Sequence, residues 1–166
     1  MTPQGALVLV LAGDVMTGRG IDQALQQHAP GQLYEPVVRD ARDYVRLAES
    51  VNGPVGAPLA PHEPWGDALP VMRAEGVDVR IVNLETSVTA TGEPWPGKGI
   101  HYRMHPANVD VLTAAHVDVC VLANNHVLDW GRDALRETLS SLHAAGVATA
   151  GAGINDAAAW APAVVA

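Results

Sequence analysis

The chain has 166 residues, of which 48% are hydrophobic and only 4% aromatic, so it is long enough for one domain with a core of aliphatic side chains. The formal net charge of −8 and the scattered arginines exclude a basic surface for nucleic acid. The single cysteine, Cys120, excludes an intrachain disulfide, and its apolar surroundings predict a buried, unreactive thiol.

Four apolar runs have the length and composition of β-strands. They cover residues 7–12, 77–84, 117–122 and 147–150. The first run is continuously apolar, which is typical of a strand covered on both faces. It has no Lys or Arg before it and Asp14 follows it closely, so it lacks the form of a secretory signal or a membrane span. We therefore expect a cytoplasmic protein without a membrane segment, and association with a membrane surface stays open.

Three segments between these runs carry apolar residues at helical spacing. We expect helices at 35–49, 106–115 and 131–145. In the first of them, Glu35 and Arg39 stand four positions apart in the order that favours an ion pair. The alternation of strands and helices predicts βαβ units and a mainly parallel sheet, which is an α/β fold.

Two long connections and the C-terminal residues depart from this alternation. Residues 52–64 and 86–99 are rich in Pro and Gly, and loops of such length in a compact domain are usually binding loops or lids. Residues 161–166 have the pattern of a strand that has just begun, with no helix or polar tail after it. We therefore expect residues 1–166 to form a single domain that is truncated at its C-terminus.

Short polar clusters follow the first three apolar runs. They lie at residues 13–19, 83–86 and 123–129. In a parallel sheet these clusters share one edge, at the carboxyl ends of the strands, where open α/β sheets bind ligands. Asp14, Glu85, Asn125 and His126 supply carboxylate, amide and imidazole groups that suit a divalent cation such as Mn, Mg, Zn or Fe. Arg19 has the fork-shaped donor group that suits a phosphate.

Each of these residues also has a simpler role when it is taken alone. Asp14 can cap the next helix, Glu85 can be solvated, Asn125 can occupy a turn, and His126 can be a hydrogen-bonded loop histidine. Asp129 lies where it would cap the helix at 131–145, and we expect that role rather than metal binding. Three clusters at equivalent strand ends nevertheless favour a shared site.

Five segments, taken together, carry a family resemblance. They are Gly-Asp-Val-Met-Thr-Gly-Arg at 13–19, Asn-Leu-Glu at 83–85, Tyr-Arg-Met-His-Pro at 102–106, Ala-Asn-Asn-His-Val-Leu-Asp-Trp-Gly at 123–131 and Gly-Ala-Gly at 151–153. In order and spacing they resemble the bacterial capsule-synthesis CapA family, which is associated with poly-γ-glutamate. The resemblance implies a metallophosphoesterase-like (calcineurin-like) fold, a layered β-sheet flanked by helices, of which this chain is the N-terminal half.

The resemblance also implies roles for single residues. Asp14 matches the Asp of the Asp-x-His phosphoesterase pattern, whereas Met16 stands in place of the His, and a thioether is a poor ligand for a hard ion. Glu85 would replace the Asp that bridges two metal ions, and Asn125 would be a metal ligand. His126 would lie beside the scissile phosphate as an acid or charge stabiliser. In such folds further histidine ligands come from the second half.

These expectations lead to two functions in different classes. The first is a capsule biosynthesis protein with a metal-dependent phosphoesterase-like site, which would make it a hydrolase. The second is a non-catalytic component of polymer synthesis or export that binds an anionic polyglutamate chain. A third alternative is a truncated chain that folds poorly because its sheet edge is unpaired. We expect an anionic phosphoester or polymer substrate and no nucleic-acid partner, and the oligomeric state stays open.

Overall fold

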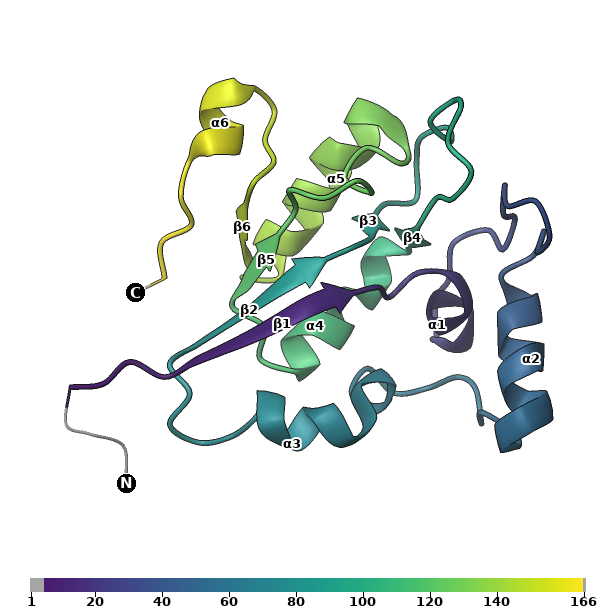
Figure 1. The fold of residues 1–166 in the computed structure, drawn as a ribbon, viewed down its shortest axis with the longest axis horizontal. Coiled ribbons are helices and arrows are strands. Elements are labelled where there is room, and N and C mark those ends of the chain that lie inside the picture. Colours follow the sequence, from purple (N-terminus) through teal and green to yellow (C-terminus); the bar gives the residue numbers. More distant parts are fainter. Residues whose placement is uncertain (1–4, 166) are drawn as a thin grey trace.

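The computed structural model describes residues 5–165, and a four-stranded parallel sheet lies at its centre (Figure 1). The strands are ordered β1-β2-β5-β6 across the sheet. They are β1 (Leu9–Val15), β2 (Val79–Leu84), β5 (Val119–Val121) and β6 (Ala148–Ala150). All three neighbouring pairs are parallel, which confirms the predicted strands and the α/β fold. The residues that follow β1, β2 and β5 therefore share one edge of the sheet.

An irregularity in β1 sets the position of Asp14. Ala12 pairs with Val82, but Asp14 pairs with Asn83, so Gly13 is an extra residue on the β1 side. A bulge of this kind changes the direction in which the following side chain points. It places Asp14 opposite Asn83 at the point where the two strands end.

The helices are short apart from two of them. The longer ones are α2 (Arg42–Asn52) and α5 (Gly131–Ala144). The others are α1 (Arg19–Ala24), the 3-10 helix η1 (Glu63–Ala68), α3 (Leu69–Met72), the 3-10 helix η2 (Pro106–Asn108), α4 (Asp110–Ala114) and α6 (Asp156–Trp160). The helix predicted at 131–145 is confirmed as α5, and the one predicted at 106–115 is confirmed as η2 followed by α4.

The first predicted helix begins later than expected, at Arg42. A carboxylate oxygen of Asp40 accepts the main-chain N–H of Arg42 at 2.9 Å, and such a bond supports a helix start at that point. Glu35 therefore lies outside the helix. Its expected ion pair with Arg39 is wrong, because Glu35 pairs with Arg19 at 2.6 Å instead.

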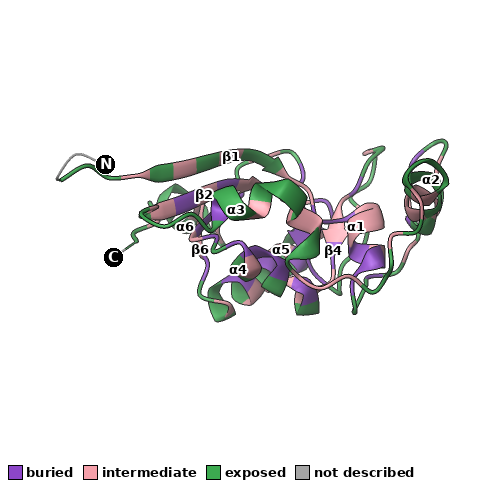
Figure 2. Cartoon of the chain, turned by 90° about the horizontal axis from the view of Figure 1, so that it is seen from below, coloured by how far each residue is buried: buried purple, intermediate pink, exposed green. Residues whose placement is uncertain are grey.

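The hydrophobic core lies on one side of the sheet, between the strands and helices α3, α4 and α5 (Figure 2). Val82, Leu112 and Leu142 are among its fully buried side chains. Cys120 is buried with them, and this burial raises the pKa of its thiol to about 12. The thiol therefore stays protonated at neutral pH, which confirms the prediction of a buried thiol without thiolate character.

The opposite face of the sheet is open at β1. Leu7, Leu9 and Leu11 are 68%, 45% and 70% exposed, and Figure 2 shows β1 along the outside of the molecule. The prediction that the apolar run at residues 7–12 is covered on both faces is therefore wrong. The reason is topological, because β1 is the edge strand and helices α3, α4 and α5 pack against the other face.

The chain after β6 forms α6 and then continues to Val165 without entering the sheet. The strand predicted at 161–166 is therefore wrong over 161–165, and residue 166 lies outside the described residues. Pro162 removes one main-chain donor from this segment, which disfavours strand pairing. None of the helices within residues 5–165 is long and apolar enough to cross a bilayer.

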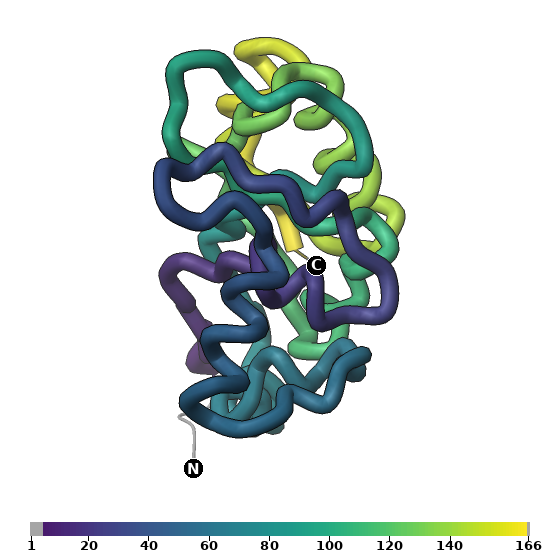
Figure 3. The backbone as a smooth tube through the Cα atoms, turned by 90° about the vertical axis from the view of Figure 1, so that its right-hand side faces the viewer, coloured from purple at the N-terminus to yellow at the C-terminus, as the bar shows by residue number. Residues whose placement is uncertain are grey.

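A long loop joins β3 (Ser87–Val88) to β4 (Arg103–Met104), and these two strands form a separate parallel pair. In Figure 3 this loop lies beside the segment between α1 and α2, across the end of the sheet. The ring of Tyr34 in that segment lies 5.6 Å from the ring of His101 in the loop and 6.0 Å from the ring of Trp130. Aromatic contacts thus hold the two segments together.

Glu137 of α5 anchors the start of the same loop. Its carboxylate accepts the hydroxyl of Thr89 at 2.5 Å and the hydroxyl of Thr91 at 2.8 Å. Burial alone would raise the pKa of Glu137, but these bonds and main-chain amides act in the opposite direction and the net shift of its pKa is downward. The ionised carboxylate is therefore the form that holds the loop.

Candidate functional site

Polar side chains at the ends of β1, β2 and β5 form a hydrogen-bonded row. Asn83 Nδ2 donates to Asp14 Oδ1 at 2.6 Å, and Asn124 Nδ2 donates to Asn83 Oδ1 at 3.0 Å. Asn124 Nδ2 also lies 3.0 Å from the main-chain oxygen of Leu84, while Asn124 Oδ1 accepts the main-chain N–H of His126 at 2.9 Å. The row therefore links three strand ends and fixes the start of the loop after β5.

The ring of His126 lies between two carboxylates and is nearly buried. Its Nδ1 lies 2.7 Å from Oδ2 of Asp129, and its Nε2 lies 3.8 Å from Oε1 of Glu85. The ring of Tyr102 stacks on it, with centroids 4.0 Å apart and an angle of 21° between the planes. Because an ionised carboxylate can only accept, Nδ1 carries the proton in the neutral ring. The lone pair of Nε2 then faces Glu85.

Asp129 is fully buried and does not cap α5. The residue at the cap position is Trp130, so Asp129 lies one residue too early and its carboxylate turns into the protein. Oδ2 accepts the main-chain N–H of Tyr102 at 2.6 Å in addition to the bond with His126, and Oδ1 pairs with Lys98. The expected capping role of Asp129 is therefore wrong.

Arg19 stands at the start of α1, and its guanidinium already has a partner. It pairs with Glu35 at 2.6 Å and lies over the rings of Tyr44 at 5.0 Å and Tyr102 at 4.7 Å. With Met16 it lines a cavity of about 320 Å³ between α1 and α2. Arg19 thus reaches the site through Tyr102, but Glu35 balances its charge. Its role as a hydrogen-bond donor to a phosphate stays a prediction.

The structure brings Asp14, Glu85 and His126 to the same edge of the sheet, as predicted. Asp14 is exposed, and the side chain of Glu85 is 21% exposed. Asn125 differs, because its side chain is exposed and its main-chain oxygen accepts a bond from Lys98. The metal-ligand roles of Asp14, Glu85 and Asn125 and the catalytic role of His126 stay predictions.

The donor groups at this edge suit Mg²⁺ or Mn²⁺. Proteins commonly hold Mg²⁺ through one or two carboxylates, and waters and substrate phosphates complete its coordination. Asp14 and Glu85 supply such carboxylates. In the part of the chain that the structure describes, no three His, Cys, Asp or Glu residues are grouped closely enough to hold a metal ion by themselves. The donor chemistry therefore fits a cation that shares its coordination with water or substrate.

The charges around the site also favour an added cation. Lys98 contacts Asp129 and is paired with it, and Arg19, which reaches the site through Tyr102, is paired with Glu35. A phosphate or carboxylate ligand would therefore meet little unpaired positive charge from the protein, in a chain of net charge −8. A divalent ion at the strand ends would supply the missing charge.

Sequence reasoning missed the contributions of Asn83, Lys98 and Tyr102. Asn83 had a detectable signal, because it precedes Glu85 by two positions and alternate residues of a strand share a face. Lys98 is the only lysine of the chain, but nothing in the sequence relates it to Asp129. The stacking of Tyr102 on His126 likewise depends on a long-range contact between two loops.

A parallel sheet with a polar row at the carboxyl ends of three strands defines an α/β protein whose candidate ligand site lies at the strand ends. The sequence profile of the family described as "Bacterial capsule synthesis protein PGA_cap" matches residues 8–166. The chain belongs to this family, which confirms the resemblance found from its sequence motifs.

Two named relatives come from Mycobacterium tuberculosis, from strains CDC 1551 / Oshkosh and H37Rv. Each carries the name "Probable polyglutamine synthesis accessory protein" and is 48% identical to this chain over 149 residues. The aligned region covers 90% of this chain and 39% of each relative. The chain therefore spans about two fifths of the length of the curated relatives that it matches.

Proposed function

We propose that this protein acts in capsule polymer synthesis as a metal-dependent hydrolase of a phosphoester, with Mg²⁺ or Mn²⁺ held at Asp14 and Glu85. Membership of the capsule synthesis family supports the first part of this proposal. The hydrolase part rests on one observation, the ring of His126 held 2.7 Å from the buried Asp129 carboxylate and 3.8 Å from Glu85. Asn125 is proposed as a further oxygen ligand because its exposed side chain lies next to His126 in the chain.

The chemistry assigned to the protein groups is proton transfer at His126. Its Nε2 would accept a proton from the attacking water, and Asp129 would stabilise the imidazolium that forms. Because the attacking and leaving oxygens lie on opposite sides of the phosphorus, the leaving oxygen would take its proton from solvent, and His126 would release its extra proton to solvent. The divalent ion, when bound, would supply positive charge for the phosphoryl oxygens. Arg19 would assist at these oxygens only if it leaves Glu35.

The proposal predicts that His126→Ala lowers hydrolysis of bis(p-nitrophenyl) phosphate by the full chain in Mn²⁺ by about 100-fold or more, because general acid–base groups contribute on that scale. The measurement is the release of p-nitrophenol with and without Mn²⁺. His62→Ala is the matched control, since His62 is exposed and remote in sequence from the three clusters, and it should retain the wild-type rate.

Two outcomes would contradict catalysis. One is the absence of Mn²⁺-dependent hydrolysis by the wild-type chain. The other is an equal rate for His126→Ala and wild type. Calorimetric titration with Mn²⁺ gives a second readout, because Glu85→Gln should weaken Mn²⁺ binding whereas Glu75→Gln, an exposed carboxylate on another segment, should not.

The second candidate is non-catalytic binding of an anionic polymer such as poly-γ-glutamate. It is favoured by the absence of a three-residue metal group in residues 5–165 and by Met16, which stands where phosphoesterases place a histidine. Divalent ions could bridge Asp14 and Glu85 to the carboxylates of the polymer. Mn²⁺-dependent binding of poly-γ-glutamate, with no hydrolysis of any phosphoester, would select this function.

A further inference from the structure

The buried carboxylate of Asp129 is satisfied by groups from three parts of the chain. Oδ2 receives His126 Nδ1 at 2.7 Å and the main-chain N–H of Tyr102 at 2.6 Å, and Oδ1 receives the ammonium group of Lys98. Burying a carboxylate is costly unless it is paired and hydrogen-bonded. An arrangement that satisfies both oxygens so fully holds the carboxylate in one orientation.

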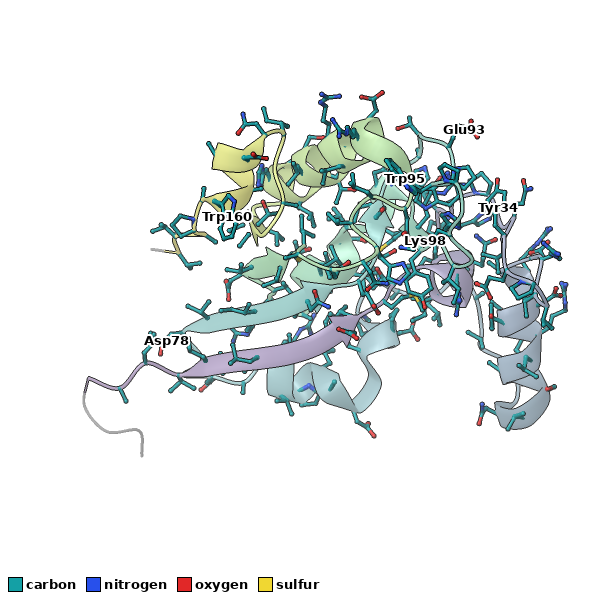
Figure 4. The ribbon with its side chains drawn as sticks, turned by 45° about the horizontal axis from the view of Figure 1, so that its top comes forward. Tyr34, Asp78, Glu93, Trp95, Lys98 and Trp160 are labelled. Carbon is teal, nitrogen blue, oxygen red and sulfur yellow. The ribbon has the colours of Figure 1, made fainter. Side chains whose placement is uncertain are left out.

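Lys98 closes this arrangement from the loop between β3 and β4. Its ammonium group contacts both Asp129 Oδ1 and the main-chain oxygen of Asn125, so it spans the segment that carries His126. In the same loop, the main-chain N–H of Trp95 donates to the main-chain oxygen of Asp129 at 2.8 Å. Figure 4 places Lys98 and Trp95 at the end of the sheet toward which the strands point. These contacts of Lys98 and Trp95 hold the β3–β4 loop against the segment that carries His126.

We infer that Asp129 and Lys98 are positioning residues for His126: Asp129 keeps the ring proton on Nδ1, and Lys98 holds Asp129 and the loop in place. This inference rests on the proposed function for its catalytic meaning. In the neutral ring, the bond to Asp129 places the proton on Nδ1, and Nε2 is directed toward Glu85. The stacked ring of Tyr102 restricts rotation of the His126 ring away from this orientation.

The tautomer decides whether the ring can act as a base. With the proton on Nδ1, the Nε2 lone pair can accept a proton from water, and the resulting cation gains a full ion pair with Asp129. With the proton on Nε2, the ring would present an N–H group toward Glu85 and could not accept a proton there. Loss of Asp129 should therefore reduce turnover far more than substrate binding.

The test is the tautomer of His126 in the full chain labelled with ¹⁵N-histidine, without metal, at a pH where the ring is neutral. Multiple-bond ¹⁵N–¹H spectra distinguish the two tautomers, and the wild-type ring should be protonated at Nδ1. Asp129→Asn should move the proton to Nε2, because the amide nitrogen can donate to Nδ1 whereas a carboxylate cannot. Asp133→Asn is the control, since that exposed carboxylate lies four residues further along, and it should leave the tautomer unchanged.

Variants of the lysine test the second part of the inference. Lys98→Met should give a mixture of tautomers, Lys98→Arg should restore most of the Nδ1 form, and the exposed Arg132→Met should have no effect. In Mn²⁺-dependent hydrolysis, Asp129→Asn should lower kcat by about 100-fold or more with a smaller change in KM.

A wild-type ring protonated at Nε2, or present as a mixture, would overturn the inference even if no variant folds. An unchanged tautomer in Asp129→Asn would overturn it as well. A wild-type Nδ1 tautomer that switches in Asp129→Asn, in a chain that hydrolyses nothing, would support the positioning of the ring and reject the hydrolase function. The tautomer and the rate therefore separate the two proposals.

Discussion

Replacement of Asp22 by Ala is expected to lower the free energy of unfolding by about 3–5 kcal/mol, because it leaves several buried donors without a partner. Asp22 of α1 is 1% exposed. Its carboxylate accepts the main-chain N–H of Ala29 at 2.7 Å, the main-chain N–H of His105 at 2.8 Å and Nδ2 of Asn108 at 2.8 Å. Asp22 thus joins α1 to η2. Urea-induced unfolding of the wild-type chain and of Asp22→Ala would measure the loss in the free energy of unfolding.

The control and the pH dependence of this effect follow from the surroundings of Asp22. Asp133→Ala removes an exposed carboxylate that pairs with Arg136 on the surface and should cost less than about 1 kcal/mol. Burial raises the pKa of Asp22 against the opposing hydrogen bonds from His105, Ala29 and Asn108. A raised pKa in the folded state adds stability below the ordinary pKa, and this contribution is lost as the pH rises. The loss in Asp22→Ala should therefore be larger at acid pH than at pH 7, and a smaller loss there would contradict this account.

Gly92→Ala is the second substitution for which we expect a large loss, of about 3 kcal/mol or more. Gly92 has a φ of +90°, and an added Cβ would lie 2.1 Å from the main-chain oxygen of Trp130. An alanine at this position would be strained by the positive φ, and its Cβ would clash with a main-chain atom that cannot easily move. The loop would have to move away from the segment that carries Asp129, which should also release Lys98. Urea-induced unfolding measures the stability, and the His126 tautomer measures the effect on the site.

Gly97→Ala separates the clash from the backbone strain. Gly97 lies in the same loop with a φ of +75°, but an added Cβ there would have no atom within 4 Å. This variant should cost only about 1–2 kcal/mol, the range for a residue held at positive φ. Equal losses for the two variants would show that the loop does not pack against Trp130 as described.

The fold could be predicted from the sequence wherever local pattern and topology agree. Continuous apolar runs identified all four strands of the main sheet, and their alternation with helical segments gave its parallel order. The start of α2 was missed because the apolar spacing continues through residues that the Asp40–Arg42 bond excludes from the helix. The open face at β1 was missed because an apolar run does not reveal how many layers cover it. Coverage depends on which other segments reach the strand.

The site was predictable to the extent that strand order places its residues together. Asp14, Glu85 and His126 were found because each lies at or just after the carboxyl end of a strand of a parallel sheet. Lys98 and the buried position of Asp129 were not found, since both depend on long-range contacts between the β3–β4 loop and the segment after β5. The helix-cap expectation for Asp129 failed because the cap position of α5 is Trp130, one residue later, and because the Asp129 carboxylate turns inward to His126, Tyr102 and Lys98.

The central claim is that the carboxyl ends of β1 and β2 hold a divalent cation that binds an anionic substrate. The most direct measurement is the anomalous scattering of manganese in crystals of the full chain grown with Mn²⁺ and inorganic phosphate. A manganese peak is expected within about 2.3 Å of a carboxylate oxygen of Asp14 or Glu85, with phosphate beside it. A manganese peak elsewhere on the protein, or none at this edge of the sheet, would contradict this claim.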